Sequence, residues 1–142
     1  PKTFKDAVRN LRISFGQMEW APVQSLSALN GTGISELLST ALRLWKQLSR
    51  RVDTSALNLA LNDWITASPP PQGRMNKFKI RYLVQTQANP VKFLAFATRP
   101  EAVSESYISY LRNRIRKDLG FDEIPVVLEV KGSRRKWEER ER

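Results

Sequence analysis

The chain has 142 residues, 41% of them hydrophobic, which suffices for one ordinary domain or for a small domain plus part of another. It contains no cysteine and no histidine, which excludes disulfides, thiolate nucleophiles, zinc sites with the usual ligands and imidazole acid-base catalysis. Its 24 lysines and arginines against 14 acidic residues leave a net charge of +10, which favours a polyanionic partner.

The hydropathy of the chain and its first residues predict its cellular location and whether it is part of a longer protein. The longest uninterrupted apolar run covers residues 93–97, far short of the roughly 20 residues that span a bilayer, so no membrane partner is expected. No secretory signal pattern opens the chain, and we therefore expect a reducing, cytoplasmic location. The chain starts with Pro1 and enters a helical pattern at once, which predicts a piece of a longer protein.

Residues 1–49 predict a helix, a strand and a second helix. Apolar residues recur at helical spacing through residues 3–15, until a glycine breaks the run. Residues 22–27 predict a short strand, a glycine-rich turn follows, and an apolar helical stripe continues over residues 34–48. Helix, strand and helix in this order belong to an α/β layer structure. Because one strand cannot form a sheet alone, this part of the chain is predicted to be incomplete.

Residues 50–131 predict a second unit that begins with a helix and two strands. Thr54 is a suitable N-cap for the helix, which three prolines at positions 69–71 end. The two strands, over residues 77–87 and 92–98, are separated by an Asn-Pro turn. We expect them to pair as antiparallel neighbours.

A helix and a third strand complete this unit. Pro100 opens the helical region, Tyr107 belongs to its apolar side and Gly120 stops it. The third strand covers residues 125–131. The unit is therefore predicted to be α+β, a three-stranded sheet covered by helices. The charged tail, residues 132–142, has no packing pattern and predicts disorder.

Two groups of basic residues are candidates for binding an anion. Lys77, Lys79 and Arg81 alternate along the first strand, and three like charges at period two repel unless something anionic faces them. The other group lies on the later helix and comprises Arg112, Arg114, Arg116 and Lys117. Because Arg112 and Arg116 are one helical turn apart, the solvated face of an amphipathic helix explains this group equally well.

The aromatic residues predict core packing rather than ligand stacking. Strand alternation places Tyr82 on the apolar face of its strand, opposite the basic residues. Trp45, Trp64 and Tyr107 fall in apolar helical stripes. We therefore expect no exposed aromatic platform.

Several segments are weak signals individually but become specific for a protein family when they occur in this order and at this spacing. They are the stretch from Trp20 to Arg51 with its SAL and glycine turn, TSALNLALNDWITASPPP, the turn QTQANP, and SYISYLRNRIR. Together they resemble the C-terminal part of the double-Era-like GTPases (Der, also called EngA), over nearly the whole chain. The resemblance implies that residues 1–49 are the remnant of a P-loop GTPase domain, that residues 50–131 form a KH-like domain, and that residues 132–142 are a charged tail.

The resemblance also assigns a role to Ser27, Ala28 and Leu29, which match the family motif whose backbone contacts the guanine base. Taken alone, these three residues fit a plain strand-to-helix turn equally well. The sequence has no match to the phosphate-cradling GxxxxGK(S/T) loop, to a Walker-B or switch aspartate, or to the NKxD motif. GTP and Mg²⁺ are therefore implied for the intact protein, and this chain alone is expected to be inactive and to hold no metal.

The function of the chain is then expected to reside in the KH-like unit. KH domains usually clamp nucleic acid with a G-x-x-G loop, but the glycines of this chain are never three apart. Basic side chains remain, and they permit phosphate contacts. The resemblance implies our favoured hypothesis, binding through such contacts to ribosomal RNA of the large ribosomal subunit as part of ribosome biogenesis. The alternative is an intramolecular regulatory module whose basic strand face packs on the GTPase domains without contacting RNA.

Overall fold

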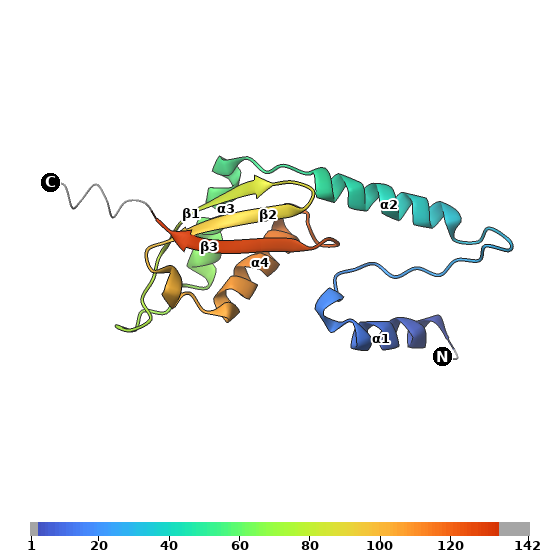
Figure 1. Ribbon diagram of the computed structural model, residues 1–142, viewed down its shortest axis with the longest axis horizontal. Coiled ribbons are helices and arrows are strands. Elements are labelled where there is room, and N and C mark those ends of the chain that lie inside the picture. Colours follow the sequence, from blue (N-terminus) through green and yellow to red (C-terminus); the bar gives the residue numbers. More distant parts are fainter. Residues whose placement is uncertain (1–2, 134–142) are drawn as a thin grey trace.

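The computed structural model describes residues 3–133 and shows four helices and a three-stranded sheet, an α+β fold as expected (Figure 1). Most of the predicted disordered tail lies outside the described residues. In chain order the elements are α1 (Phe4–Ser14), the 3₁₀ turn η1 (Gly16–Met18), α2 (Ile34–Ser49), α3 (Thr54–Ala67), β1 (Ile80–Gln87), β2 (Val91–Ala97), the 3₁₀ turn η2 (Pro100–Ala102), α4 (Glu105–Leu119) and β3 (Val126–Gly132).

The sheet has the order β1-β2-β3, with β1 antiparallel to β2 and β3 parallel to β2. Helices α3 and α4 cover one of its faces, and the apolar core lies between them and the strands (Figure 1). The largest fully buried side chains are Trp64, Phe78, Phe93, Phe121, Leu57, Leu61, Leu83, Leu111, Ile115 and Val91. No helix among the described residues is both long and apolar enough to cross a membrane.

Polar contacts fix α3 against α4 at the centre of this core. The indole Nε1 of Trp64, a side chain only 1% exposed, donates a hydrogen bond of 2.7 Å to Asp118 Oδ2. In return, the hydroxyl of Tyr110 donates to the backbone carbonyl of Trp64 at 2.8 Å. A buried Trp N–H or Tyr O–H without a partner is costly, so these bonds select one packing of the two helices.

The ends of the two helices follow local sequence, with one correction. Ser104 caps α4 by accepting from the backbone N–H of Tyr107, and Gly120, at φ 80°, ends it in the left-handed conformation that favours glycine. The N-cap of α3 is Asp53 rather than the predicted Thr54, which is the first helical residue. The helix therefore begins one position earlier than expected, since Asp53, at φ −57° and ψ 136°, is the last residue outside it.

A bulge in β1 overturns the predicted faces of that strand. Ile80 pairs with Ala97 and Tyr82 with Phe96, which leaves Arg81 without a partner between them. The extra residue reverses the alternation, so Leu83 faces the helices and is fully buried, whereas Tyr82 is 43% exposed on the open face. The expectation that Tyr82 packs in the core was therefore wrong.

Polar side chains close the outer edge of β1. The amide of Asn58, on α3, donates to the carbonyl of Leu83 and accepts from its N–H, both at 2.9 Å. The bulge also turns Gln85 inward, where its amide accepts from the N–H of Val52 at 2.8 Å and donates to the carbonyl of Arg50 at 2.9 Å. These bonds satisfy edge groups of the sheet and attach the segment between α2 and α3 to it.

The predicted strand over residues 22–27 is absent from the structure. These residues are extended but pair with no other strand, because the described chain supplies no neighbour on which a ladder could form. Trp45, expected in the core, is 58% exposed, since no sheet covers the apolar stripe of α2. The prediction that the first part of the chain lacks its sheet agrees with this arrangement.

A carboxylate is one of the groups that hold helix α2 to the α+β unit. Leu44 and Leu48 also pack on the core, and the N–H of Asn89 donates to the Leu48 carbonyl at 3.0 Å. Glu123, in the loop before β3, accepts from Arg43 Nε at 2.5 Å and from Arg43 Nη2 at 2.8 Å. The amide of Gln47 donates to the same carboxylate at 3.2 Å and accepts from the N–H of Glu123 at 3.0 Å. The hydrogen bond from Arg43 is the main reason that the pKa of Glu123 lies below its usual value.

Amide hydrogen exchange tests the two-part description of the chain. Residues 22–27 form no ladder hydrogen bonds, so the amides of residues 23–26 should exchange at near the rate of an unfolded chain. Amides in β1 and β3 should exchange orders of magnitude more slowly, because they open only with the core. Equal protection in both regions, measured by NMR at neutral pH, would contradict this description.

Acid should weaken the attachment of α2. Because the pKa of Glu123 is lower in the folded than in the unfolded chain, its stabilisation is full above an unfolded pKa of about 4.3 and is lost as the pH falls through the folded value. In urea unfolding, the wild-type chain should be more stable than Glu123→Gln above pH 5, and the difference should vanish toward pH 3. A difference that is independent of pH would show that the charge of this carboxylate does not hold the helix.

Candidate nucleic-acid interface

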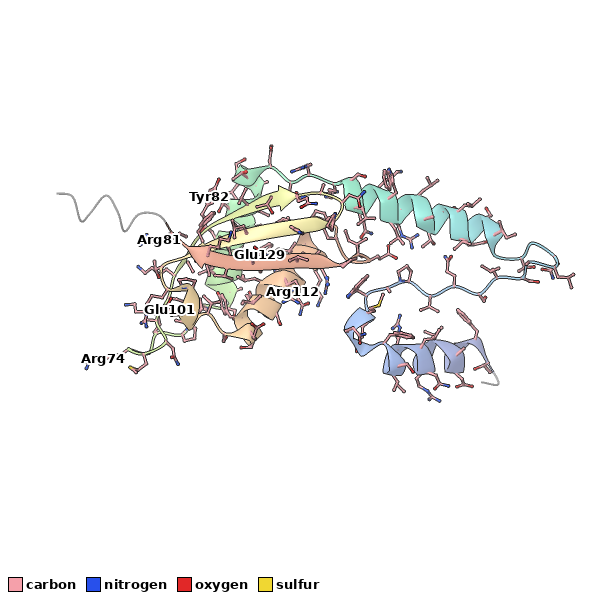
Figure 2. All side chains as sticks on the ribbon, in the orientation of Figure 1. Arg74, Arg81, Tyr82, Glu101, Arg112 and Glu129 are labelled. Atoms are coloured by element: carbon pink, nitrogen blue, oxygen red, sulfur yellow. The ribbon has the colours of Figure 1, made fainter. Side chains whose placement is uncertain are left out.

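Basic side chains gather around a hollow of about 400 Å³ at one end of the sheet. Figure 2 shows two of them, Arg74 and Arg81, at the end of the sheet opposite α2. The structure thus brings the predicted Lys77, Lys79 and Arg81 together, and all three are exposed. The lining comprises Arg74, Lys77, Phe78, Lys79, Arg81, Thr98 and Arg99.

The hollow is built by the segment that enters β1. Phe78 is 2% exposed and packs edge to face on Tyr107, with ring centroids 5.3 Å apart. This buried ring directs its two neighbours, Lys77 and Lys79, outward. The backbone of Lys79 is paired with Thr98 by two hydrogen bonds of 3.0 Å, one to the threonine hydroxyl and one from its N–H. The cations therefore project from a fixed backbone.

Sequence analysis missed two members of this group. Arg74 lies in the loop before β1 and Arg99 directly follows the paired Thr98, so both reach the hollow only once β1 and β2 have paired. Their positions in the sequence carry no periodic signal. The available signal was that basic residues lie around the start of the first strand and just after the second strand. Antiparallel pairing places these two positions at the same end of the sheet.

The charges of the hollow are largely uncompensated within the described chain. Arg99 forms an ion pair of 3.3 Å with Glu101. Between residues 3 and 133, no acidic side chain forms an ion pair with Arg74, Lys77, Lys79 or Arg81. Several cations held close together without acidic neighbours produce a positive potential that attracts a phosphate-rich ligand.

The second predicted group, on α4, does not line the hollow. Arg114 pairs with Asp118 at 2.8 Å, beside the Trp64 hydrogen bond, and so serves the packing of the helices. The guanidinium of Arg116 lies 5.3 Å from the ring centroid of Trp20, and partial burial together with the charge of Arg112 lowers its pKa. Lys117 is exposed.

The loop that resembles a guanine-contact motif is an ordered turn before α2. The carbonyl of Ser27 accepts from the N–H of Gly31, and its own N–H donates to the carbonyl of Thr32, both at 2.9 Å. Gly33 follows at φ 85°, where a Cβ atom would lie 2.4 Å from a backbone oxygen. The turn presents Ala28 and Leu29 to solvent.

The described residues do not add the rest of a nucleotide site to this loop. No group of three acidic side chains that could hold a metal ion occurs in residues 3–133. In the structure, Ser27, Ala28 and Leu29 lead into α2, whose contacts with the α+β unit include the bonds of Arg43 and Gln47 to Glu123. They are remote from the basic hollow, none of whose lining residues belongs to this loop.

Comparison with known proteins adds a family match. Residues 51–131 match the family model described as the KH-domain-like, C-terminal domain of EngA bacterial GTPase enzymes. The chain is 45% identical over 128 residues to GTPase Der of Treponema pallidum subsp. pallidum, covering 90% of this chain and 28% of that protein. It is 32% identical over 138 residues to GTPase Der of Helicobacter hepaticus, covering 97% of this chain and 28% of that protein. The chain thus spans less than a third of the length of these relatives.

The isolated chain should neither bind GTP tightly nor hydrolyse it. By the family resemblance, the turn at Ser27 would contact only a base, whereas most of the binding energy of a nucleoside triphosphate comes from groups around its phosphates and magnesium ion. Titration calorimetry with GTP and Mg²⁺ should show no binding at micromolar concentrations. A micromolar dissociation constant for this chain alone would contradict the assignment.

Proposed function

Because this chain belongs to the EngA (Der) GTPase family and carries its C-terminal KH-like domain, we propose that it binds ribosomal RNA of the large ribosomal subunit through the basic hollow. The observation that supports this is the set of cations around the hollow, four of which have no acidic partner between residues 3 and 133. RNA is the abundant polyanion with which a ribosome-assembly GTPase of the cytoplasm would work. GTP and Mg²⁺ would bind to the GTPase domains of the intact protein.

Phosphate contacts suit this site better than readout of base edges by side-chain amides. Its polar lining is almost entirely lysine and arginine, which neutralise phosphates and carry little sequence information. The hollow is lined by residues near the start of β1 and the end of β2, whereas α2 lies at the opposite end of the sheet (Figure 1), so the docked helix leaves the hollow open.

A second role, coupling to the GTPase domains, is supported by the attachment of α2. The bonds from Arg43 and Gln47 to Glu123 and from Gln85 to the segment after α2 fix this helix to the sheet. In this role the KH-like unit would follow movements of the GTPase domain to which α2 belongs. The two roles use opposite ends of the sheet and are compatible.

Removing charge from the hollow should weaken RNA binding and reduce its dependence on salt. For Lys77→Ala, Lys79→Ala and Arg81→Ala combined, the slope of log affinity against log salt should fall by roughly two to three units, since each lost phosphate contact removes about 0.7 to 0.9. Fluorescence anisotropy with structured ribosomal RNA fragments between 50 and 300 mM salt measures this slope.

The matched control removes the same charge elsewhere. Lys5, Arg12 and Lys46 are exposed on α1 and α2, and their combined replacement by alanine should leave the slope nearly unchanged. If both triple variants lower affinity and slope equally, only net charge matters and the hollow is not the site. If the first triple variant binds RNA like the wild type, the coupling role takes its place.

A further inference from the structure

The open face of the sheet carries an aromatic row at the same end as the basic hollow. The register places Tyr82, Phe96 and Lys131 side by side across β1, β2 and β3. The rings of Tyr82 and Phe96 have their centroids 6.2 Å apart at an interplanar angle of 40°. Phe96 is partly buried and supports the side of the Tyr82 ring, so the tyrosine presents a fixed aromatic surface to solvent.

This row adjoins the hollow through one residue of the chain. Arg81, left unpaired by the bulge, lines the hollow, and the next residue, Tyr82, lies on the open face (Figure 2). On the other side, Phe96 is two residues before Thr98, which also lines the hollow. A ligand bound in the hollow therefore has the Tyr82 ring immediately next to it.

The charges around the row favour an anionic occupant. Lys131 ends the row on β3 and Arg81 stands at its border, whereas Lys92 lies on the same face of β2 two rows away, at the far end of the strand. Glu129 is the one acidic residue that the three described strands place on this face, and it belongs to the next row, opposite Leu94. An aromatic ring bordered by cations is the arrangement on which single-stranded nucleic acids stack their bases.

We propose that the open face binds the unpaired bases of single-stranded RNA, with a base stacked on Tyr82 while the adjoining phosphates lie in the basic hollow. This inference rests on the proposed RNA binding and specifies its substrate as a loop, a bulge or a single strand. A base-paired helix buries the faces of its bases, so it can reach the hollow only with its phosphates. The chain should consequently prefer single strands over duplexes of equal charge.

The alternative occupants of this face are a second copy of the chain and another domain of the protein. Two copies facing each other would bring Lys131, Lys92 and Arg81 of each copy toward the same cations of the other. Glu129 is the one acidic residue that the described strands place on this face to offset them. RNA is anionic, so these cations do not repel it. Binding of RNA also explains why the basic hollow adjoins this face.

The test separates stacking from phosphate contacts with two probes of equal charge. The probes are a single-stranded ten-nucleotide oligoadenylate and an abasic ribose-phosphate strand of the same length, each measured by anisotropy on the full chain at fixed salt. Tyr82→Ala should weaken oligoadenylate binding roughly ten- to a hundred-fold, the usual loss for one stacked base, and leave the abasic strand unaffected. Tyr82→Phe, which keeps the ring, should bind both probes like the wild type.

Leu59→Ala serves as the control for loss of an exposed apolar side chain, since Leu59 is 68% exposed and lies on α3, away from the open face. It should bind both probes like the wild type. Unchanged melting temperatures will show that the variants fold. Equal weakening of both probes by Tyr82→Ala, or no weakening of either, would overturn the stacking proposal.

The same measurements distinguish this inference from the proposed function. If the Lys77, Lys79 and Arg81 triple variant loses both probes while Tyr82→Ala loses neither, the hollow binds RNA and stacking is wrong. If the wild-type chain binds neither probe nor structured RNA, both proposals fail. If Tyr82→Ala leaves RNA binding intact but removes a concentration-dependent dimer in sedimentation, the face is a self-interface and the stacking proposal is again overturned.

Discussion

The bulge at Arg81 decides which side of the sheet each later residue of β1 occupies. By adding one residue opposite β2, it turns Leu83 and Gln85 toward the helices and Tyr82 toward solvent. Leu83 then joins the core, and Gln85 reaches the backbone at Arg50 and Val52. Arg81 itself is released from the ladder into the basic hollow. One irregularity thus serves core packing, the attachment of α2 and the candidate RNA surface.

The two ends of the sheet are physically different. At one end, the Glu123 carboxylate and the Gln85 amide attach α2 and the segment after it through direct hydrogen bonds. At the other end, four exposed cations have no ion-pair partner among residues 3–133, and a fifth, Arg99, is paired with Glu101. Between them lies the core covered by α3 and α4, in which the hydrogen bond from Trp64 to Asp118 joins the two helices. This packed core connects the end that holds α2 to the basic end.

The sequence was sufficient for most elements of the fold because their signals are local. Helical stripes, the proline stop after α3 and the glycine stop after α4 each depend on a few neighbouring residues. Strand pairing is different, since it depends on residues distant in the chain. Plain alternation could not reveal the bulge at Arg81, and residues 22–27 have strand composition but no neighbour with which to pair.

The candidate site could also be predicted only in part from the sequence. Lys77, Lys79 and Arg81 stood out as a local run, but Arg74 and Arg99 join them only through the pairing of β1 with β2. The arginines of α4 are evenly spaced in the sequence but lie in different environments. Arg114 is paired with Asp118, and Arg116 lies over Trp20. No periodic pattern indicated the contacts of Asn58 and Gln85: Asn58 closes the edge of β1 at Leu83, and Gln85 bonds the backbone at Arg50.

The central claim is that RNA binds where the hollow meets the open face. NMR titration of the ¹⁵N-labelled chain with a single-stranded RNA tests it most directly. The largest shifts should fall on residues 77–82 and 96–99, with little change along α1 and α2, whereas shifts centred on α4 or spread evenly over all basic residues would contradict it.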